Sequence, residues 1–372
     1  MEARINKEKF LKCIARVQSI VERKTNMPIL STVLLTAVDD RIHIYATDLE
    51  IGLEQIIPSE IKHNGSITIS GRKLFEILKE SRSDNFHIKG KENNRVFLSD
   101  DVASFNLACY PVDEYPVVVK PEDVNLVEIN TEILAEMINK TVHSVAREDI
   151  APKLAGVFIE KVSVNDTWLL KMVATDGHRL SVVEKDIIGI ENLNLERGVM
   201  VPKKGILELA KMASECETVE MGFKNKFCVL KSHNMSLVLR LFESRFPDYT
   251  GIIPKEEQLK KIVVNKDIFL NAMRRMLILT NKRYNAVKMH LKENSLQLVS
   301  VNPEIGEGNE NIIIRYVGDS LDLVFNPRFF VDMLQSMNSD SIFMGVTDNS
   351  TPCILTGDAD KGFLGVIMPM RF

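Results

Sequence analysis

The spacing of apolar residues near the start of the chain predicts a helix followed by strands. Four apolar residues recur at intervals of four, three and four residues, which places them on one helical face: Phe10, Ile14, Val17 and Val21. After an Asp39-Asp40 turn, Ile42, Ile44 and Ala46 alternate with polar residues, which predicts a half-buried strand. Along the whole chain this becomes a recurring order of helix, paired strands, strand, helix and paired strands.

The order recurs with similar residues in it. Residues 45–50 (YATDLE) resemble residues 173–178 (VATDGH) 128 positions later, and residues 71–78 resemble residues 202–209 with an offset of 131. A fainter third copy includes residues 326–333, and residues 265–280 repeat the opening helix. Because separate segments keep nearly the same offset, we infer three copies of about 120 to 130 residues.

Proline and charge interrupt the pattern at residues 120–123 and 254–257. We therefore place three domains at residues 1–121, 122–254 and 255–372. Short turns such as Glu293-Asn294 join consecutive strands without a crossover helix, so the predicted sheets are antiparallel. The expected fold class is α+β, with two helices packed on antiparallel sheet in each domain.

Composition describes an ordinary globular chain with 45% apolar and 26% charged residues. No uncharged segment reaches the length of a membrane span, and the chain opens on a charged helix with no signal-peptide pattern, so we expect a cytoplasmic protein without a membrane partner. The five cysteines and seven histidines are scattered, which predicts reduced core cysteines and no metal site. Gly306-Glu307-Gly308 reads as a flexible connector, and no cofactor is expected.

The formal net charge of −4 argues against a simple nucleic-acid binder, but the distribution of cations matters more than their sum. On the first helix Lys9, Lys12, Arg16 and Arg23 are spaced as one stripe. The second helix of each copy also begins with cations: Arg72 and Lys73, Lys203 and Lys204, and Arg328. The repeat would turn these faces toward one side, giving a weakly basic surface that stays near DNA without being anchored. The helix predicted over 131–146 is an exception, with Glu132, Glu136 and only Lys140.

The densest run of polar chemistry is residues 174–180 (ATDGHRL), near the midpoint of the chain. A hydrolase using Asp176 and His178 is one interpretation. However, an acid/base pair needs partners that converge from different elements, whereas these candidates are consecutive along one backbone, which favours a structural or binding turn. A repeat-built scaffold that binds other proteins is a further alternative.

Several motifs resemble one family, the bacterial replicative sliding clamp, the beta subunit of DNA polymerase III. They are residues 27–30 (MPIL), 47–50 (TDLE), 174–180 (ATDGHRL), 245–249 (RFPDY) and 368–371 (MPMR). The resemblance covers the whole chain. It implies a non-catalytic processivity factor: a head-to-tail homodimer that forms a six-domain ring, encircles duplex DNA irrespective of sequence, slides, and tethers the replicative polymerase subunit.

The resemblance also implies three sets of site residues. A pocket between domains two and three would receive a short peptide with a glutamine and bulky Leu or Phe anchors, carried by the polymerase, the clamp loader, repair polymerases and other partners. Its matching positions are Leu154, Thr175, Gly177, His178, Arg179, Leu180, Pro247, Ile252, Asn326, Val366, Met368, Pro369, Met370 and Arg371. Matching DNA contacts are Lys24, Arg72, Lys73, Lys203, Lys204 and Tyr284. At the dimer interface, Phe105 and Leu107 would meet Ile278 and Leu279.

The chain departs from the family pattern at a few positions. Ala151 and Gly251 stand where some members have arginine, so the pocket rim is less basic and partner preference is expected to differ. Glu148 occupies a loop position that is neutral in some relatives, and we expect it to weaken DNA contact there. The terminal Phe372 replaces a frequent leucine conservatively.

Overall fold

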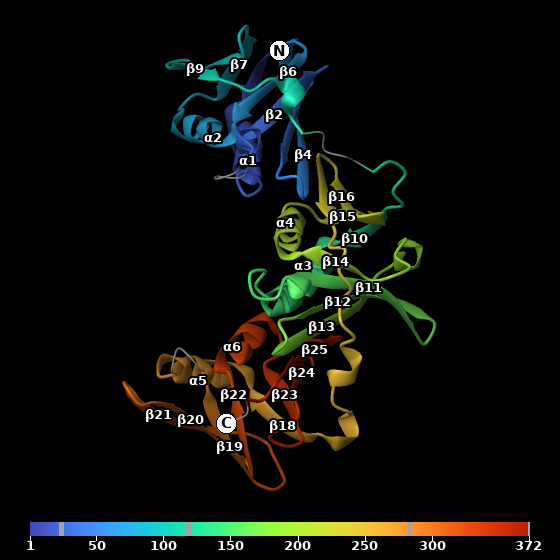
Figure 1. Cartoon of the computed structure of the whole chain (residues 1–372), viewed down its shortest axis with the longest axis vertical. Coiled ribbons are helices and arrows are strands. Elements are labelled where there is room, and N and C mark those ends of the chain that lie inside the picture. The colour runs from blue at the N-terminus through green and yellow to red at the C-terminus, as the bar shows by residue number, and fades with distance from the viewer. Residues whose placement is uncertain (22–25, 117–120, 281–284, 371–372) are drawn as a thin grey trace. The chain divides into compact units, whose positions relative to one another are not determined.

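The computed structural model describes residues 1–21, 26–116, 121–280 and 285–370 (Figure 1). Two compact units make up the chain. The first joins Met1–Glu128 with Thr218–Leu241, and the second joins Ile129–Glu217 with Phe242–Phe372. The strand and helix order repeats three times, as the sequence pattern predicts.

The first repeat contributes all of its elements to the first unit. They are β1 (Glu2–Asn6), α1 (Lys7–Val17), β2 (Thr32–Val38), β3 (Arg41–Thr47), β4 (Ile51–Pro58), β5 (Glu60–His63), β6 (Gly65–Ser70), α2 (Gly71–Glu80), β7 (Asn85–Lys91), β8 (Arg95–Ser99) and β9 (Ser104–Ala108). One sheet has the order β5-β1-β7-β8-β9.

The second repeat has the same order of elements. They are β10 (Val127–Asn130), α3 (Thr131–Thr141), β11 (Gly156–Val164), β12 (Thr167–Thr175), β13 (Arg179–Asp186), β14 (Val199–Pro202), α4 (Lys203–Ala213), β15 (Thr218–Lys224), β16 (Phe227–Ser232) and β17 (Met235–Arg240). Strand β17 pairs with β4 of the first repeat, in an eight-stranded sheet with the order β10-β15-β16-β17-β4-β3-β2-β6.

The third repeat lies in the second unit. Its elements are β18 (Lys260–Asn265), α5 (Lys266–Ile278), β19 (Val287–Lys292), β20 (Ser295–Asn302), β21 (Gly306–Ile313), β22 (Leu321–Phe325), α6 (Pro327–Ser336), β23 (Ser341–Val346), β24 (Cys353–Gly357) and β25 (Phe363–Ile367). Strand β25 pairs with β13, which gives an eight-stranded sheet β14-β11-β12-β13-β25-β24-β23-β18, and the remaining sheet has the order β21-β20-β19-β22.

The predicted fold class is therefore confirmed: each repeat packs two helices on antiparallel sheet. Polar caps explain where several helices begin. The side chains of Asn6, Asn130, Asn265 and Asn326 each accept a hydrogen bond from a backbone N–H in the first helical turn, which satisfies donors that the helix leaves unpaired. The domain boundaries after residues 121 and 254 stay a prediction.

The predicted amphipathic patterns match the observed burial. Phe10, Ile14 and Val17 are buried on α1, and β3 buries Ile42, Ile44 and Ala46. Helix α1 ends at Val17, so Val21 is buried beyond the helix. No helix in the described part of the chain is long and apolar enough to cross a membrane.

Three expectations about individual residues were wrong or incomplete. Gly306-Glu307-Gly308 is not a connector but the start of strand β21. Arg16 is buried, so it does not extend an exposed cationic stripe, and Arg23 lies outside the described residues. Cys13, Cys228 and Cys353 are buried as predicted, whereas Cys109 and Cys216 are half-buried.

The helix predicted over 131–146 ends at Thr141, and its single central cation is not a surface group. Lys140 is fully buried, with its Nζ 2.5 Å from Glu136 Oε1 and 2.8 Å from Asp360 Oδ1. Glu136 lies four residues earlier on the same helix, a spacing at which side chains meet. Asp360 could not be foreseen because it arrives from the loop before β25.

Candidate functional site

The turn between β12 and β13 is held by its own side chains. Thr175 Oγ1 accepts a hydrogen bond from Gly177 N at 3.1 Å and donates one to the Arg179 carbonyl at 2.6 Å. Asp176 Oδ1 accepts from the backbone N–H groups of His178 and Arg179, both at 3.0 Å. Gly177 has a φ of 86°, the left-handed region that glycine enters readily, and a Cβ there would meet nothing within 4 Å. The turn is rigid and exposes its backbone at Gly177.

The same turn chemistry appears in the first repeat, as the sequence similarity predicts. Thr47 Oγ1 accepts from Leu49 N at 2.9 Å, and Asp48 Oδ1 accepts from Glu50 N at 3.0 Å. These side-chain acceptors replace backbone partners in both turns. The repeated Thr-Asp pair is therefore a structural signature and needs no catalytic explanation.

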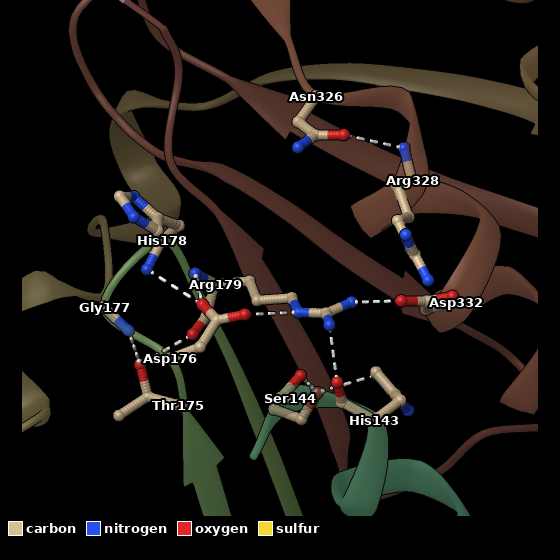
Figure 2. A network of polar contacts seen from close by, with 11 residues as sticks. His143, Ser144, Thr175, Asp176, Gly177, His178, Arg179, Asn326, Arg328 and Asp332 are labelled. Atoms are coloured by element: carbon tan, nitrogen blue, oxygen red, sulfur yellow. Dashed lines mark hydrogen bonds and ion pairs between the residues drawn. The ribbon is translucent and has the colours of Figure 1, made fainter. Parts of the chain in front are cut away.

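The Arg179 side chain joins three separate elements (Figure 2). Its Nε donates to Asp176 Oδ2 at 2.9 Å, one terminal nitrogen donates to Asp332 Oδ2 on α6 at 2.7 Å, and the other donates to the His143 carbonyl at 2.5 Å. The guanidinium also lies 4.7 Å from the centroid of the Phe329 ring. Only 10% of the side chain is exposed.

Neighbouring residues of β13 face opposite sides of the sheet. Ser181 lies on the same side as Arg179, with its Oγ 2.7 Å from Ser144 Oγ and 3.2 Å from His143 Nε2. Leu180 and Val182 belong instead to an apolar cluster whose other buried members are Val173, Tyr249 and Val366. The apolar surface and the Arg179 guanidinium therefore lie on opposite sides of the strand.

The apolar side is covered by the segment that follows β17. Phe246 stacks on Phe158 with ring centroids 4.9 Å apart, and Tyr249 donates a hydrogen bond to Glu160 Oε1 at 2.6 Å. Ile253 packs against the same cluster. Pro247 is exposed, and Ile252, in a short 3-10 turn (Thr250–Ile252), is 42% exposed. These two predicted pocket residues thus belong to a segment anchored by its aromatic neighbours.

The end of the chain lies beside the turn. Val366 pairs with Leu180 in the sheet, Met368 N donates to the His178 carbonyl at 2.9 Å, and Met370 N donates to the Val324 carbonyl at 2.7 Å. Met368, Pro369 and Met370 are half-buried, while Arg371 lies outside the described residues. The structure therefore brings residues 175–180 and 366–370 together, across nearly two hundred positions of sequence.

Two further predicted pocket residues are placed by other elements. Asn326 caps α6, directly after β22, the strand that receives Met370. Leu154 ends a short 3-10 turn (Pro152–Leu154), and its carbonyl accepts from Ala146 N at 3.2 Å. Ala151, at the rim position, precedes that turn.

Sequence reasoning missed three residues of this region: His143, Phe329 and Asp332. The Phe329 ring lies nearly parallel to that of His178, with centroids 6.3 Å apart and an interplanar angle of 13°. Phe329 and Asp332 are three apart on α6 and share a helix face, which is the only signal that the sequence offered. Both residues are 150 or more positions from Arg179 in the sequence, so no local sequence pattern predicts that they contact it.

Burial and charge affect the ionisation of groups near Arg179. Burial, together with the Arg179 charge, lowers the pKa of His143 to about 4, so this imidazole is neutral at pH 7. The same two causes, burial first, lower the pKa of Lys203. The Asp176 carboxylate already accepts bonds at both oxygens and does not present a free general base.

Comparison with known proteins decides the family. Models of the N-terminal, central and C-terminal domains of the DNA polymerase III beta subunit match residues 1–119, 128–248 and 250–371. The beta sliding clamp of Haemophilus influenzae is 31% identical over 375 residues, covering 100% of both chains. The chain belongs to the family of bacterial beta sliding clamps. It is thereby a processivity factor, an accessory subunit of a DNA polymerase.

Solved clamp structures share the whole fold. The beta sliding clamp of Bartonella birtlesii, bound to griselimycin, superposes with a TM-score of 0.94 at 26% identity, covering 100% of both chains. The DNA polymerase sliding clamp of Caulobacter crescentus gives the same TM-score, 0.94, at 26% identity and the same coverage.

Four of the cations that the clamp resemblance assigns to DNA contact lie in the first turn of the second helix of a repeat, as predicted: Arg72, Lys73, Lys203 and Lys204. Arg72 and Lys73 are exposed on α2, but both pair with Glu76, at 2.8 and 2.9 Å. Lys203 is half-buried at the start of α4, and Lys204 is exposed. Lys24 and Tyr284 lie outside the described residues. The first turn of α2 therefore carries less free charge than its sequence indicates.

The residues that the resemblance assigns to the clamp interface lie on an edge strand and at the end of a helix. Phe105 and Leu107 are half-buried on β9, the last strand of its sheet. Ile278, at the end of α5, is 74% exposed, and Leu279 follows it. Leu279 lies next to β21, an edge strand, where a Cβ on Gly308 would come within 3.0 Å of Leu279 Cδ1.

Proposed function

We propose that two copies of the chain close head to tail into a ring around duplex DNA and hold a polymerase at the primer end. The ring slides because its contacts with DNA carry no sequence information. Tethering raises the effective concentration of the polymerase at its template, and no bond is made or broken. We place this activity in the cytoplasm, with domains at 1–121, 122–254 and 255–372.

The sheet junctions between repeats carry this proposal. Within one chain, β4 of the first repeat pairs with β17 of the second, and β13 of the second pairs with β25 of the third. Both junctions are antiparallel and join equivalent strands. The equivalent strands that end their sheets are β21 of the third repeat and β9 of the first. A second copy supplies a partner for each of these two strands, and a two-fold axis then leaves neither β9 nor β21 unpaired in either copy.

The repeat also specifies the register of the missing junction. Phe105 on β9 pairs with Leu98 on the preceding strand of its sheet. The residues equivalent to Phe105 in the second and third repeats are Leu237 on β17 and Gly365 on β25. Leu237 faces Leu53 at the first junction, and Gly365 faces Ser181 at the second.

In the third repeat, Gly308 is the residue equivalent to Leu53 and Ser181. Leu53 pairs with Ala46 and Ser181 pairs with Ala174 on the preceding strand, and Gly308 pairs in the same way with Ser300. Phe105 should therefore lie opposite Gly308 of the partner subunit. The small glycine leaves room there for an aromatic ring above Leu279 of the partner subunit.

We further propose that the apolar side of the Thr175–Leu180 turn receives partner peptides. The exposed Ile252 and the half-buried Met368, which lie over the buried Leu180 and Val366, offer an adaptable apolar wall for Leu or Phe anchors, and exposed backbone at Gly177 allows a close approach. The carriers would be the replicative polymerase subunit, the clamp loader, repair polymerases and other proteins with such a motif. With Ala151 and Gly251 at the rim, this pocket should favour partners with fewer acidic flanking residues.

DNA contact is proposed for Lys24, Arg72, Lys73, Lys203, Lys204 and Tyr284. The sharing of Glu76 by Arg72 and Lys73 supports weak, transient phosphate contact, which suits sliding better than anchoring. Glu148 is exposed and should weaken contact in its loop. A hydrolase is disfavoured because Asp176 is committed to its own turn and to Arg179.

Retention on DNA tests the ring. Labelled protein is assembled on nicked circular DNA with a clamp loader and gel-filtered at high salt, before and after a single cut of the circle. We expect it to stay on the circle at salt that screens phosphate contacts and to leave the linear form. Equal loss from both forms, or steeply salt-dependent binding to both, would identify a scaffold that does not encircle DNA.

A further inference from the structure

The Arg179 side chain does not point into the apolar surface that its neighbours form. Its guanidinium lies among Asp176, Asp332 and the His143 carbonyl (Figure 2). Because neighbouring residues of a strand face opposite sides of the sheet, this is the side of β13 away from Leu180 and its apolar cluster. Three nitrogens donate to three different acceptors, and the group is nearly buried. A partner peptide on the Leu180 side would not meet this charge.

The acceptors of Arg179 belong to two walls of the pocket. Asp176 shapes the turn whose His178 carbonyl accepts from Met368 N. Asp332 lies on α6, the helix that Asn326 caps. One guanidinium therefore links the turn, on one side, to the helix that carries Asn326, on the other.

We propose that Arg179 is a positioning residue of the peptide pocket, which fixes the spacing between the Thr175–Leu180 turn and helix α6 from behind. The inference rests on the proposed peptide function of this site. Its planar fork suits the role, because a lysine ammonium is a point charge and cannot hold acceptors in three fixed directions. Phe329 completes the arrangement, since its ring lies against the guanidinium and beside His178.

Asp332→Asn separates positioning from direct contact. It preserves size and leaves the apolar surface untouched, but it removes the charge that holds Arg179 to α6. Affinity is measured by fluorescence polarisation with two labelled peptides, both with a glutamine and Leu and Phe anchors, one with an acidic flank and one without. We expect both peptides to bind about tenfold more weakly, within the usual range for coupled contacts. Asp340→Asn, an exposed carboxylate of the same repeat, is the matched control and should bind as the wild type.

Two further readouts distinguish positioning from general damage. Hydrogen exchange of a peptide spanning residues 172–182 should quicken in Asp332→Asn, while exchange in β20 is unchanged. Arg179→Lys should also weaken both peptides, and combining it with Asp332→Asn should add little, because the two residues share one interaction. Adding Asp332→Glu to Arg179→Lys, a longer acid for a shorter base, should restore part of the affinity.

A direct-contact role would give a different pattern. Arg179→Lys would then weaken only the acidic peptide, and Asp332→Asn would bind both peptides as the wild type does, which would overturn the positioning role. The same holds if the double variant shows the full sum of the single losses. Failure of the wild-type chain to bind either peptide would instead refute the proposed peptide pocket itself.

Discussion

At the scale of single residues, Gly177 combines a left-handed backbone angle with an open position. Replacing it by alanine should cost about 1 kcal/mol of folding stability, because an L-residue is disfavoured at its φ of 86°. The new methyl meets nothing within 4 Å, so it collides with no part of the chain and projects where we place the peptide backbone. The free energy of peptide binding should therefore weaken by more than the free energy of folding does. Peptide titrations measure the first and thermal melts the second.

Gly251→Ala is the matched control for this change. It also places its methyl in open space, but its φ lies outside the left-handed region, so stability should be unchanged. If Gly177→Ala bound peptide as tightly as the wild type, the partner backbone would not approach the turn at this point.

His143 gives the region a predictable response to acid. In the folded chain its pKa is lowered to about 4, because burial and then the Arg179 charge disfavour the charged ring. An unfolded histidine titrates near 6.5. Between these values the unfolded chain binds a proton that the folded chain does not, so stability falls as the pH drops through this window. Above pH 7 the group contributes no pH dependence.

The measurement is the melting temperature from pH 7.5 to 4 for wild type, His143→Gln and His63→Gln. As the pH falls, the melting temperature of the His143→Gln variant should decrease less steeply than that of the wild type, because glutamine does not titrate. His63 is exposed, and its variant should follow the wild-type curve. Parallel curves for the wild type and His143→Gln would show that the ring is accessible to protons in the folded state.

At the scale of elements, the Lys140–Asp360 pair fastens α3 of the second repeat to the loop before β25 of the third. Both side chains are 0% exposed, and Asp360 also accepts from Asn338 N at 2.8 Å and from Ser339 Oγ at 2.6 Å. Lys140→Met should cost about 3–5 kcal/mol of unfolding free energy, because it leaves a buried carboxylate without its cation. Urea denaturation measures the loss.

Lys261→Met provides the comparison for a surface pair. Lys261 pairs with Glu256 at 2.8 Å, but both side chains are mostly exposed, and such pairs contribute at most about 1 kcal/mol. If Lys140→Met and Lys261→Met both lowered the free energy of unfolding by only about 1 kcal/mol, the buried Asp360 carboxylate would have to be neutralised in some other way.

Much of each element could be predicted from the sequence, because helix and strand periodicity is a local property. The buried faces of α1 and β3 follow directly from it. Strand β21 was missed because its sequence (GEGNENII) is polar and glycine-rich and does not show the apolar alternation of a typical strand. Such a sequence is compatible with a strand at the edge of a sheet. The length of α3 was overestimated because the chain turns after Thr141 to bring Ser144 to Ser181.

The candidate site was predictable as a set of residues but not as a geometry. Family resemblance put Arg179 among the pocket residues, yet which way its side chain points depends on the face of β13 that packs against the helices. One of those helices is α6, which is far away in sequence and supplies Asp332 to Arg179. Asp332 and His143 were missed for the same reason, since nothing local links them to the turn.

At the scale of the whole molecule, the internal repeat turns the proposed dimer into a geometric prediction. If the junction between copies follows the two junctions seen within the chain, Asn106 lies opposite Glu307 of the partner subunit. Directly opposed residues in antiparallel strands have Cα atoms about 4.5–5.5 Å apart, which a disulfide can span. Asn106→Cys with Glu307→Cys, in a Cys109→Ser background, should therefore form a covalent dimer under mild oxidation.

The control pair shifts the register by two residues. Asn106→Cys with Asn309→Cys places the partners diagonally, at about 7–8 Å, where a disulfide should form poorly. Non-reducing gels compare the two yields. A higher yield from the control pair would mean that the junction between copies does not repeat the junctions within the chain.

We expect the apolar contact proposed beneath this junction to determine whether the ring closes. Ile278 is 74% exposed in the single chain, so replacing it removes little that the folded monomer needs, whereas a dimer would bury it. Ile278→Ala with Leu279→Ala should therefore give monomers at micromolar protein by mass measurement, with a melting temperature close to that of a monomeric wild-type sample. Ile188→Ala, which is 96% exposed away from the sheet edges, should stay dimeric. A double variant that stays dimeric would move the interface away from α5, and the aromatic contact proposed for Phe105 would go with it.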